Sequence, residues 1–76
     1  MAELTNGIDK RVSKGDHVYT VELNGGTAEL QYYVSDGITK TVPDSNTETD
    51  GSIVQLKAGL VKAVVTGGAR VWLSEA

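Results

Sequence analysis

The sequence of 76 residues contains no cysteine and only one histidine. Disulfide bridges are therefore excluded, and a conventional zinc site, which needs several Cys or His ligands, is not expected. We expect no metal and no cofactor. The lack of cysteine also fits synthesis in a reducing cytoplasm.

Phenylalanine is absent too, and the aromatic residues are three tyrosines and one tryptophan. The core must therefore consist mainly of Val, Leu, Ile and Ala side chains. In so short a chain, the free energy gained by burying apolar area nearly cancels the conformational entropy lost on ordering. Without disulfides or metals, partner chains are the favoured source of additional buried area, and we expect a homo-oligomer.

Long apolar runs and basic clusters are lacking as well. The longest apolar run is too short for a membrane-spanning helix, and residues 1–4 show no signal-peptide pattern. The net charge is −3, and the seven basic residues are scattered from Lys10 to Arg70. Nucleic-acid-binding proteins usually concentrate such residues on one face, so we expect neither a membrane nor nucleic acid as a partner.

Alternation of apolar and polar residues dominates the centre of the chain. Residues 17–23 and 27–34 each alternate with period two, which is typical of half-buried β-strands. Asn24-Gly25-Gly26 between them is a common connection in hairpins. These two segments are predicted to pair as an antiparallel hairpin.

Turn residues separate further short strands, which we expect at residues 38–42, 52–56, 60–65 and 69–73. Pro43 ends the first of these because it cannot donate a ladder hydrogen bond. Residues 60–65 have five apolar members in six and are expected to form the most buried strand. Six strands without a helical segment predict an all-β fold, a small antiparallel sandwich or barrel.

Residues 1–16 are predicted to be an N-terminal arm, and residues 17–76 a single β-domain. Leu4, Ile8 and Val12 have helical spacing, but glycines interrupt the arm and argue against a helix. A short strand at 10–13 is an option. The arm is expected either to be disordered or to dock on a neighbouring chain. In the second case Leu4 and Ile8 are candidate interface residues.

No catalytic arrangement is expected, so the chain is predicted not to be an enzyme. The polar loop 44–51 lacks the glycine and glutamate positions of an EF-hand and is interpreted as solvated. His17, with only Asp16 as an adjacent carboxylate, is interpreted as structural. Glu22 and Glu29 would lie near each other across the predicted hairpin. Paired carboxylates can hydrolyse glycosides, but solvated surface charges are the favoured interpretation.

Two aromatic residues are candidate interface anchors. Tyr33 falls on the polar face of its strand, and Trp72 lies opposite Val71 and Leu73. Large aromatics on the outer face of a small β-domain often anchor interfaces. Alternatively, these aromatics are structural, because a two-layer sandwich can use both faces of an edge strand. Both interpretations stay open. Arg70 shares the face of Trp72 and is expected to pair with a carboxylate of a neighbouring subunit.

The turns of the chain carry a resemblance to a known group of proteins. The residues concerned are Gly25-Gly26-Thr27-Ala28 with Leu30-Gln31-Tyr32, Ser35-Asp36-Gly37, Leu56-x-Ala58-Gly59, and Val65-Thr66-Gly67-Gly68 with Val71. This pattern covers about two-thirds of the chain and resembles small β-structured virion proteins of tailed bacteriophages.

The resemblance implies a capsid decoration or cement protein, often a trimer, made in the host cytoplasm and located on the capsid surface of the virion. Its partner would be the major capsid protein. The alternative is a small tail-fibre or receptor- or glycan-binding module of the virion, with Tyr33 and Trp72 facing the ligand. A third hypothesis is a monomeric glycan-binding or hydrolytic domain that uses Glu22 and Glu29.

Overall fold

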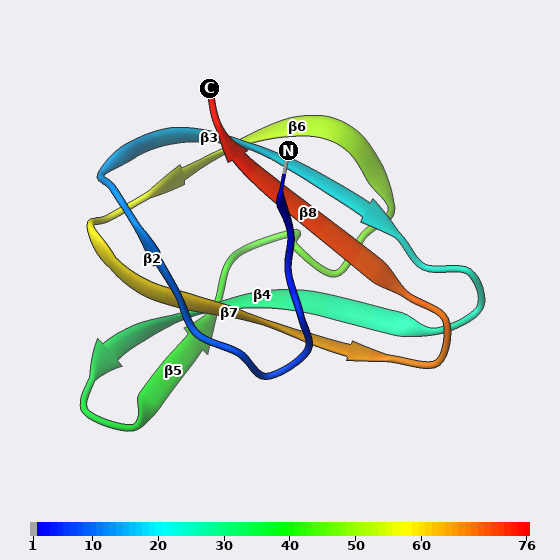
Figure 1. The fold of residues 1–76 in the computed structure, drawn as a ribbon, viewed down its shortest axis with the longest axis horizontal. Coiled ribbons are helices and arrows are strands. Elements are labelled where there is room, and N and C mark those ends of the chain that lie inside the picture. Colours follow the sequence, from blue (N-terminus) through cyan, green and yellow to red (C-terminus); the bar gives the residue numbers. More distant parts are fainter. Residues whose placement is uncertain (1) are drawn as a thin grey trace.

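The computed structural model describes residues 2–76, which form eight β-strands and no helix. The strands are β1 (Ala2–Glu3), β2 (Lys10–Val12), β3 (Gly15–Glu22), β4 (Thr27–Ser35), β5 (Ile38–Thr41), β6 (Thr49–Leu56), β7 (Gly59–Thr66) and β8 (Arg70–Glu75). They make two antiparallel sheets, in the orders β1-β8-β3-β6 and β2-β7-β4-β5 (Figure 1). The predicted all-β class is confirmed. The predicted number of six strands is wrong, because β1 and β2 add two short ones.

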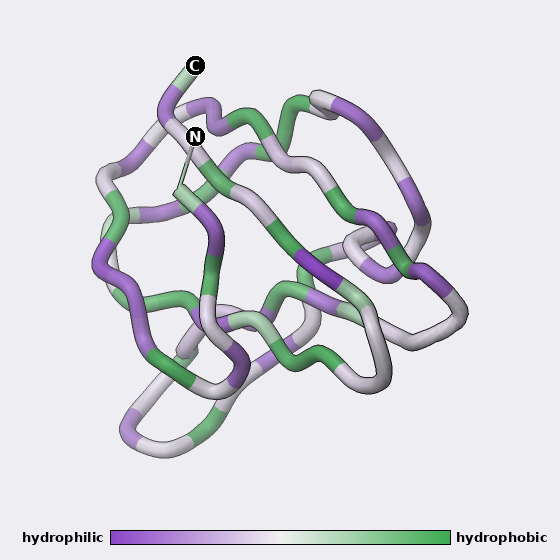
Figure 2. The backbone as a smooth tube through the Cα atoms, turned by 45° about the vertical axis from the view of Figure 1, so that its right-hand side comes forward, coloured by the Kyte–Doolittle hydropathy of each residue, from purple (hydrophilic) through white to green (hydrophobic). Residues whose placement is uncertain are grey.

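The core lies between the two sheets and follows from the period-two alternation of the strands. Figure 2 shows hydrophobic and hydrophilic residues alternating along much of the backbone. In β3, His17, Tyr19 and Val21 are buried and face the second sheet, which contributes Leu30 from β4. One face of each strand therefore supplies the core, and the other faces outward.

Strand β7 does not meet the expectation that it is the most buried. Only Val61 and Ala63 are buried in it, whereas β3 buries three side chains. Leu60 and Val64 lie on the outer face of the second sheet and are half-buried. A strand in a two-layer sandwich has a single core face, so an apolar run does not bury every residue.

The predicted hairpin is wrong. Strand β3 pairs with β6 and β8, whereas β4 pairs with β5 and β7. The tight turn itself is present: Asn24 and Gly25 have φ values of 48° and 82°, and the Gly26 N–H donates to the Leu23 carbonyl at 2.7 Å. This turn carries the chain from one sheet to the other instead of joining neighbouring strands.

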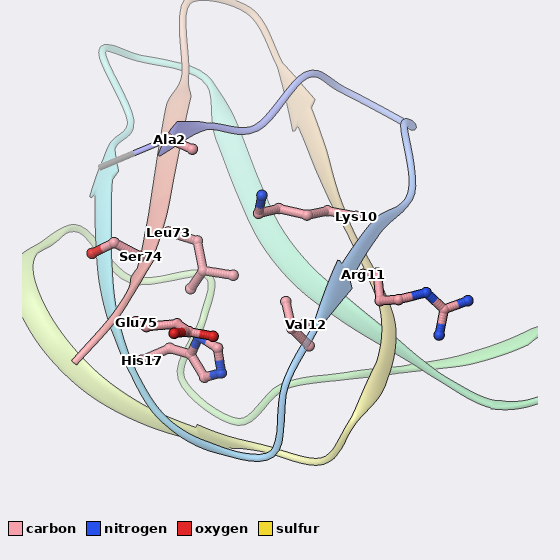
Figure 3. Close-up of a pocket in the computed structure, with 8 residues that line it drawn as sticks. All are labelled: Ala2, Lys10, Arg11, Val12, His17, Leu73, Ser74 and Glu75. Carbon is pink, nitrogen blue, oxygen red and sulfur yellow. The ribbon is translucent and has the colours of Figure 1, made fainter.

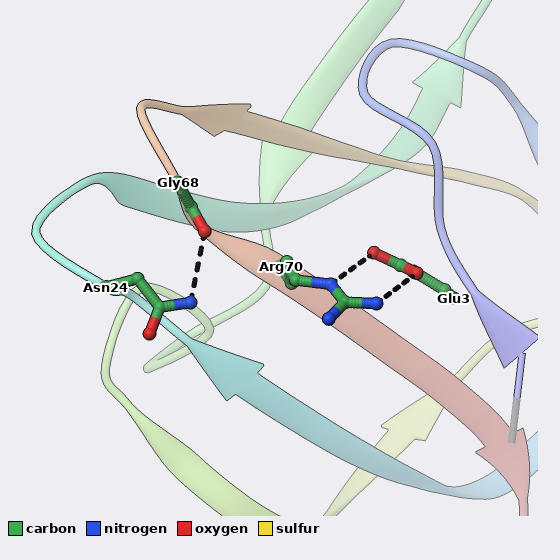
Figure 4. A network of polar contacts seen from close by, with 4 residues as sticks. All are labelled: Glu3, Asn24, Gly68 and Arg70. Carbon is green, nitrogen blue, oxygen red and sulfur yellow. Dashed lines mark hydrogen bonds and ion pairs between the residues drawn. The ribbon is translucent and has the colours of Figure 1, made fainter.

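A second crossing lies against the first. The turn between β7 and β8 also passes from sheet to sheet, and the Asn24 side-chain amide donates to the Gly68 carbonyl at 3.1 Å (Figure 4). A Cβ on Gly26 would lie 2.0 Å from the Thr66 carbonyl oxygen. Only glycine permits this approach between two turns that lie far apart in the sequence.

Residues 2–12 lie along strands of their own chain, an arrangement not among the two expected for the arm. Strand β1 pairs with β8, and β2, at the optional strand position, pairs with β7. Between them the Leu4 N–H donates to the Val71 carbonyl and the Gly7 N–H to the Ala63 carbonyl. The segment thereby closes the side of the sandwich formed by β8 and β7.

Candidate functional site

Arg70 and Trp72 lie together on the outer face of the first sheet, as predicted. The Arg70 Nε and Nη2 atoms each donate to the Glu3 carboxylate at 2.9 Å (Figure 4). The guanidinium carbon also lies 4.8 Å from the centroid of the Trp72 ring. These hydrogen bonds lower the pKa of Glu3 and raise that of Arg70. The carboxylate expected from a neighbouring subunit is thus supplied by β1 of the same chain.

Tyr33 lies on the outer face of the second sheet, so the structure does not bring it to Trp72. Its hydroxyl donates to Asp9 Oδ1 at 2.7 Å, and the Lys62 ammonium lies 5.7 Å from its ring centroid. The hydrogen bond to Asp9 raises the pKa of Tyr33. Tyr33 is therefore held by Asp9 of the N-terminal segment, and Trp72 by Arg70, which Glu3 of that segment binds. The role of both aromatics in an interface stays a prediction.

The two apolar candidates of the N-terminal segment have different surroundings. Leu4 is only 7% exposed and belongs to the core. Ile8 is 61% exposed and precedes β2 in the chain. Of the two, Ile8 has the side chain that is open to contact with another molecule.

Glu22 and Glu29, which were expected to lie near each other across the hairpin, lie in different sheets. Glu22 lies on β3 opposite Arg70 of β8. Glu29 lies on β4 in the other sheet, where it accepts a hydrogen bond from the Thr41 hydroxyl. The failed hairpin prediction explains this, because the expected proximity depended on pairing between β3 and β4.

His17 and its surroundings fit the structural interpretation. The side chain is buried, and its Nε2 donates to the Ser13 carbonyl at 2.9 Å. It lines a cavity of about 280 Å³ between β8 and β2 (Figure 3). Figure 3 shows Lys10 pointing into this cavity and Arg11 pointing away, so the basic side chains do not converge there.

Ser45 is a buried residue that sequence reasoning missed. Its hydroxyl oxygen accepts the Leu30 N–H of β4 at 3.0 Å, and its carbonyl accepts the Tyr19 hydroxyl of β3 at 2.7 Å. It thereby bridges the two sheets, and burial raises the pKa of Tyr19. The interpretation of this loop as solvated is wrong at Ser45. A serine among polar neighbours gives no signal of burial; only the turn at Pro43-Asp44 hints that the chain bends inward.

A groove follows the edge strand β6. One part, of about 440 Å³, lies between Pro43-Asp44 and residues 52–54 of β6. An adjoining part, of about 460 Å³, is lined by Tyr32, Pro43 and Leu56, among others. The two parts share Pro43, and the groove lies on the side of the first sheet opposite β1. Hollows beside an open strand edge suit the binding of an extended chain.

Comparisons with protein-family models, with curated proteins and with solved structures find no match to this chain. Within residues 2–76, no three His, Asp or Glu side chains gather in a way that would hold a metal ion. The same residues include no helix that is long and apolar enough to cross a membrane.

Proposed function

We propose that this chain is a structural virion protein that binds the outside of a phage head and stabilises it, as a decoration or cement protein. The turn and strand residues that resemble such proteins support this proposal. The observation that carries it is an apolar strip across the outer face of the first sheet. The strip consists of Trp72 on β8, Val18 on β3 and Ile53 on β6.

The pairing of the strands places the three side chains on the same face, with Trp72 diagonal to Val18. Val18 is paired with Ile53 on one side and with Ser74 on the other, and Ser74 lies two residues from Trp72 on the same face. Trp72 and Val18 are half-buried, while Ile53 is 59% exposed. An apolar strip on an open sheet face is the kind of surface that binds another protein.

Trp72 is suited to anchor such an interface because its ring is already held in place. The Arg70 guanidinium stacks on the ring and is itself fixed by Glu3. A side chain ordered before binding loses little conformational entropy in the complex, which favours affinity. The partner we propose is the major capsid protein. The trimer implied by the resemblance stays a prediction.

The proposal is tested by adding the protein to shells assembled from the major capsid protein encoded in the same genome. Co-sedimentation should show saturable binding, and W72A should weaken it by about tenfold or more. The matched control is Y33A, which removes an aromatic ring from the opposite sheet and should leave binding unchanged. Binding that does not saturate shell sites would favour the tail-fibre or receptor-binding module, and equal loss in both variants would contradict the role of the strip.

A further inference from the structure

Strand β6 differs from the other edge strands of the two sheets. Strands β1, β2 and β5 have two, three and four residues, and β2 and β5 carry basic residues. Strand β6 has eight residues, and its segment 52–56 contains neither charge nor proline. Natural sheets protect their edges by short strands, charges or proline, because open edges pair with other chains. Segment 52–56 has none of these protections.

The backbone of β6 has hydrogen-bonding groups that face away from its neighbour. The Asp16 carbonyl accepts the Ala76 N–H at 3.2 Å, so the backbone groups of Asp16 face β8. Because these groups alternate along an antiparallel strand, those of His17 face β6 and its partner Val54. The N–H and C=O groups of Ile53 and Gln55 must then point out from the sheet edge.

We propose that a second copy of this chain pairs with the open edge, β6 against β6, in antiparallel orientation. Ile53 lies opposite Ile53 of the other copy at the two-fold axis. An interface of this kind is isologous, because both copies use the same strand, and it closes after two copies. The outward backbone groups of Ile53 supply the hydrogen bonds at the axis. Gln55 lies opposite Gly51 of the other copy, and because the Gly51 N–H already donates to the Thr20 hydroxyl, only the Gln55 N–H is left to donate a hydrogen bond there.

Charge complementarity favours a second copy in this orientation. Asp50 lies near the start of β6, and Lys57 directly follows its end. With Ile53 at the two-fold axis, antiparallel pairing places Lys57 of each copy opposite Thr49 of the other, one residue along the chain from Asp50. Parallel pairing would bring like charges together, which is unfavourable. The contact would also join the two apolar strips into one, running from Trp72 of one copy to Trp72 of the other.

Sedimentation equilibrium over protein concentrations from about 10 μM to about 1 mM tests the proposal, since an interface of this size binds weakly. We expect a monomer–dimer equilibrium, and I53K should raise its dissociation constant by about tenfold or more, because it places two ammonium groups at the axis. The matched control is I38K on β5, where the isoleucine is 57% exposed against 59% for Ile53. This variant should dimerise like the wild type.

Amide hydrogen exchange locates the contact independently of any variant. The amides of Ile53 and Gln55 should exchange quickly in dilute protein and become protected as the concentration rises, while the amide of Val54 is protected throughout. A protein that stays monomeric, equal effects of the two lysine substitutions, or unchanged exchange at these amides would each overturn the proposal. The result does not depend on capsid binding, so it leaves the proposed function to its own test.

Discussion

The Tyr19 hydroxyl donates a hydrogen bond of 2.7 Å to the main-chain carbonyl of Ser45 inside the core. Because the Ser45 hydroxyl also contacts Leu30, one serine connects a strand of each sheet. A loop rich in polar residues thus contributes a structural link between the layers. Buried hydrogen bonds of this kind are costly to leave unpaired.

Replacing Ser45 by alanine should destabilise the fold. The variant S45A leaves the buried Leu30 N–H without its acceptor, at a cost of about 1–3 kcal/mol. Urea unfolding measures the difference. T47A, an exposed position of the same loop, is the control and should stay within about 0.5 kcal/mol of the wild type. Equal effects of the two substitutions would contradict the bridging role.

Alkaline pH should reveal the burial of Tyr19. Its pKa is raised in the folded state, mainly by desolvation, above the ordinary value of 10.0. Above about pH 10 the unfolded chain therefore loses this proton while the folded chain keeps it, and stability falls as the pH rises. Y19F should be less stable than the wild type at neutral pH, and the gap should narrow between about pH 9 and 11.5. A gap that stays constant in urea unfolding over this range would refute the prediction.

Where the β3–β4 turn lies against the β7–β8 turn, a methyl group should be tolerated at Gly68 and not at Gly26. G26A would bring a Cβ to within 2.0 Å of the Thr66 carbonyl oxygen, and we expect a loss of about 3 kcal/mol or more. The control is G68A, whose Cβ would find its nearest neighbour, Asn24, at 3.5 Å. Its cost should stay below about 1 kcal/mol. Similar urea midpoints for the two variants would contradict a steric conflict between a Cβ at position 26 and the Thr66 carbonyl oxygen.

Acid pH should weaken the ion pair between Arg70 and Glu3. The folded-state pKa of Glu3 lies below its ordinary value of 4.5, so the pair stabilises the fold above that pH and ceases to do so as the pH falls through the folded-state pKa. E3Q should therefore unfold at slightly lower urea than the wild type near pH 7, and equally near pH 2. Both side chains are about half exposed, so the difference is small and should shrink in about 1 M salt. D36N in the β4–β5 turn is the control. A difference in stability between E3Q and the wild type that does not change with pH would contradict the stabilising role of the Arg70–Glu3 ion pair.

Local features of the fold were predictable from the sequence, but strand pairing was not. The φ values of Asn24 and Gly25 are those that the Asn-Gly-Gly turn predicts. Which strands pair, however, involves contacts between distant parts of the chain, such as the approach of Gly26 to Thr66. Hairpin signals are local, so they do not report such a contact.

The sequence predicted on which face of the sheet the candidate aromatic residues lie, but it did not predict which residues contact them. Period-two alternation places Tyr33 and Trp72 on outer faces, and the structure agrees. Their neighbours Asp9 and Glu3 come from the N-terminal segment. A short strand at 10–13 was an option from the sequence, and β2 occupies this position, but nothing in the sequence indicated β1 or the docking of both strands on the chain's own sheets.

The pairing of β1 with β8 and of β3 with both β6 and β8 has a consequence for biosynthesis. Ala2 is paired with Leu73, and His17 with Glu75, so β1 and β3 need a partner strand that is translated long after them. The first sheet is incomplete until β8 emerges, and contacts of such long sequence separation form slowly. The apolar side chains of β3 therefore lack one of their two neighbouring strands until residues 70–75 have been translated.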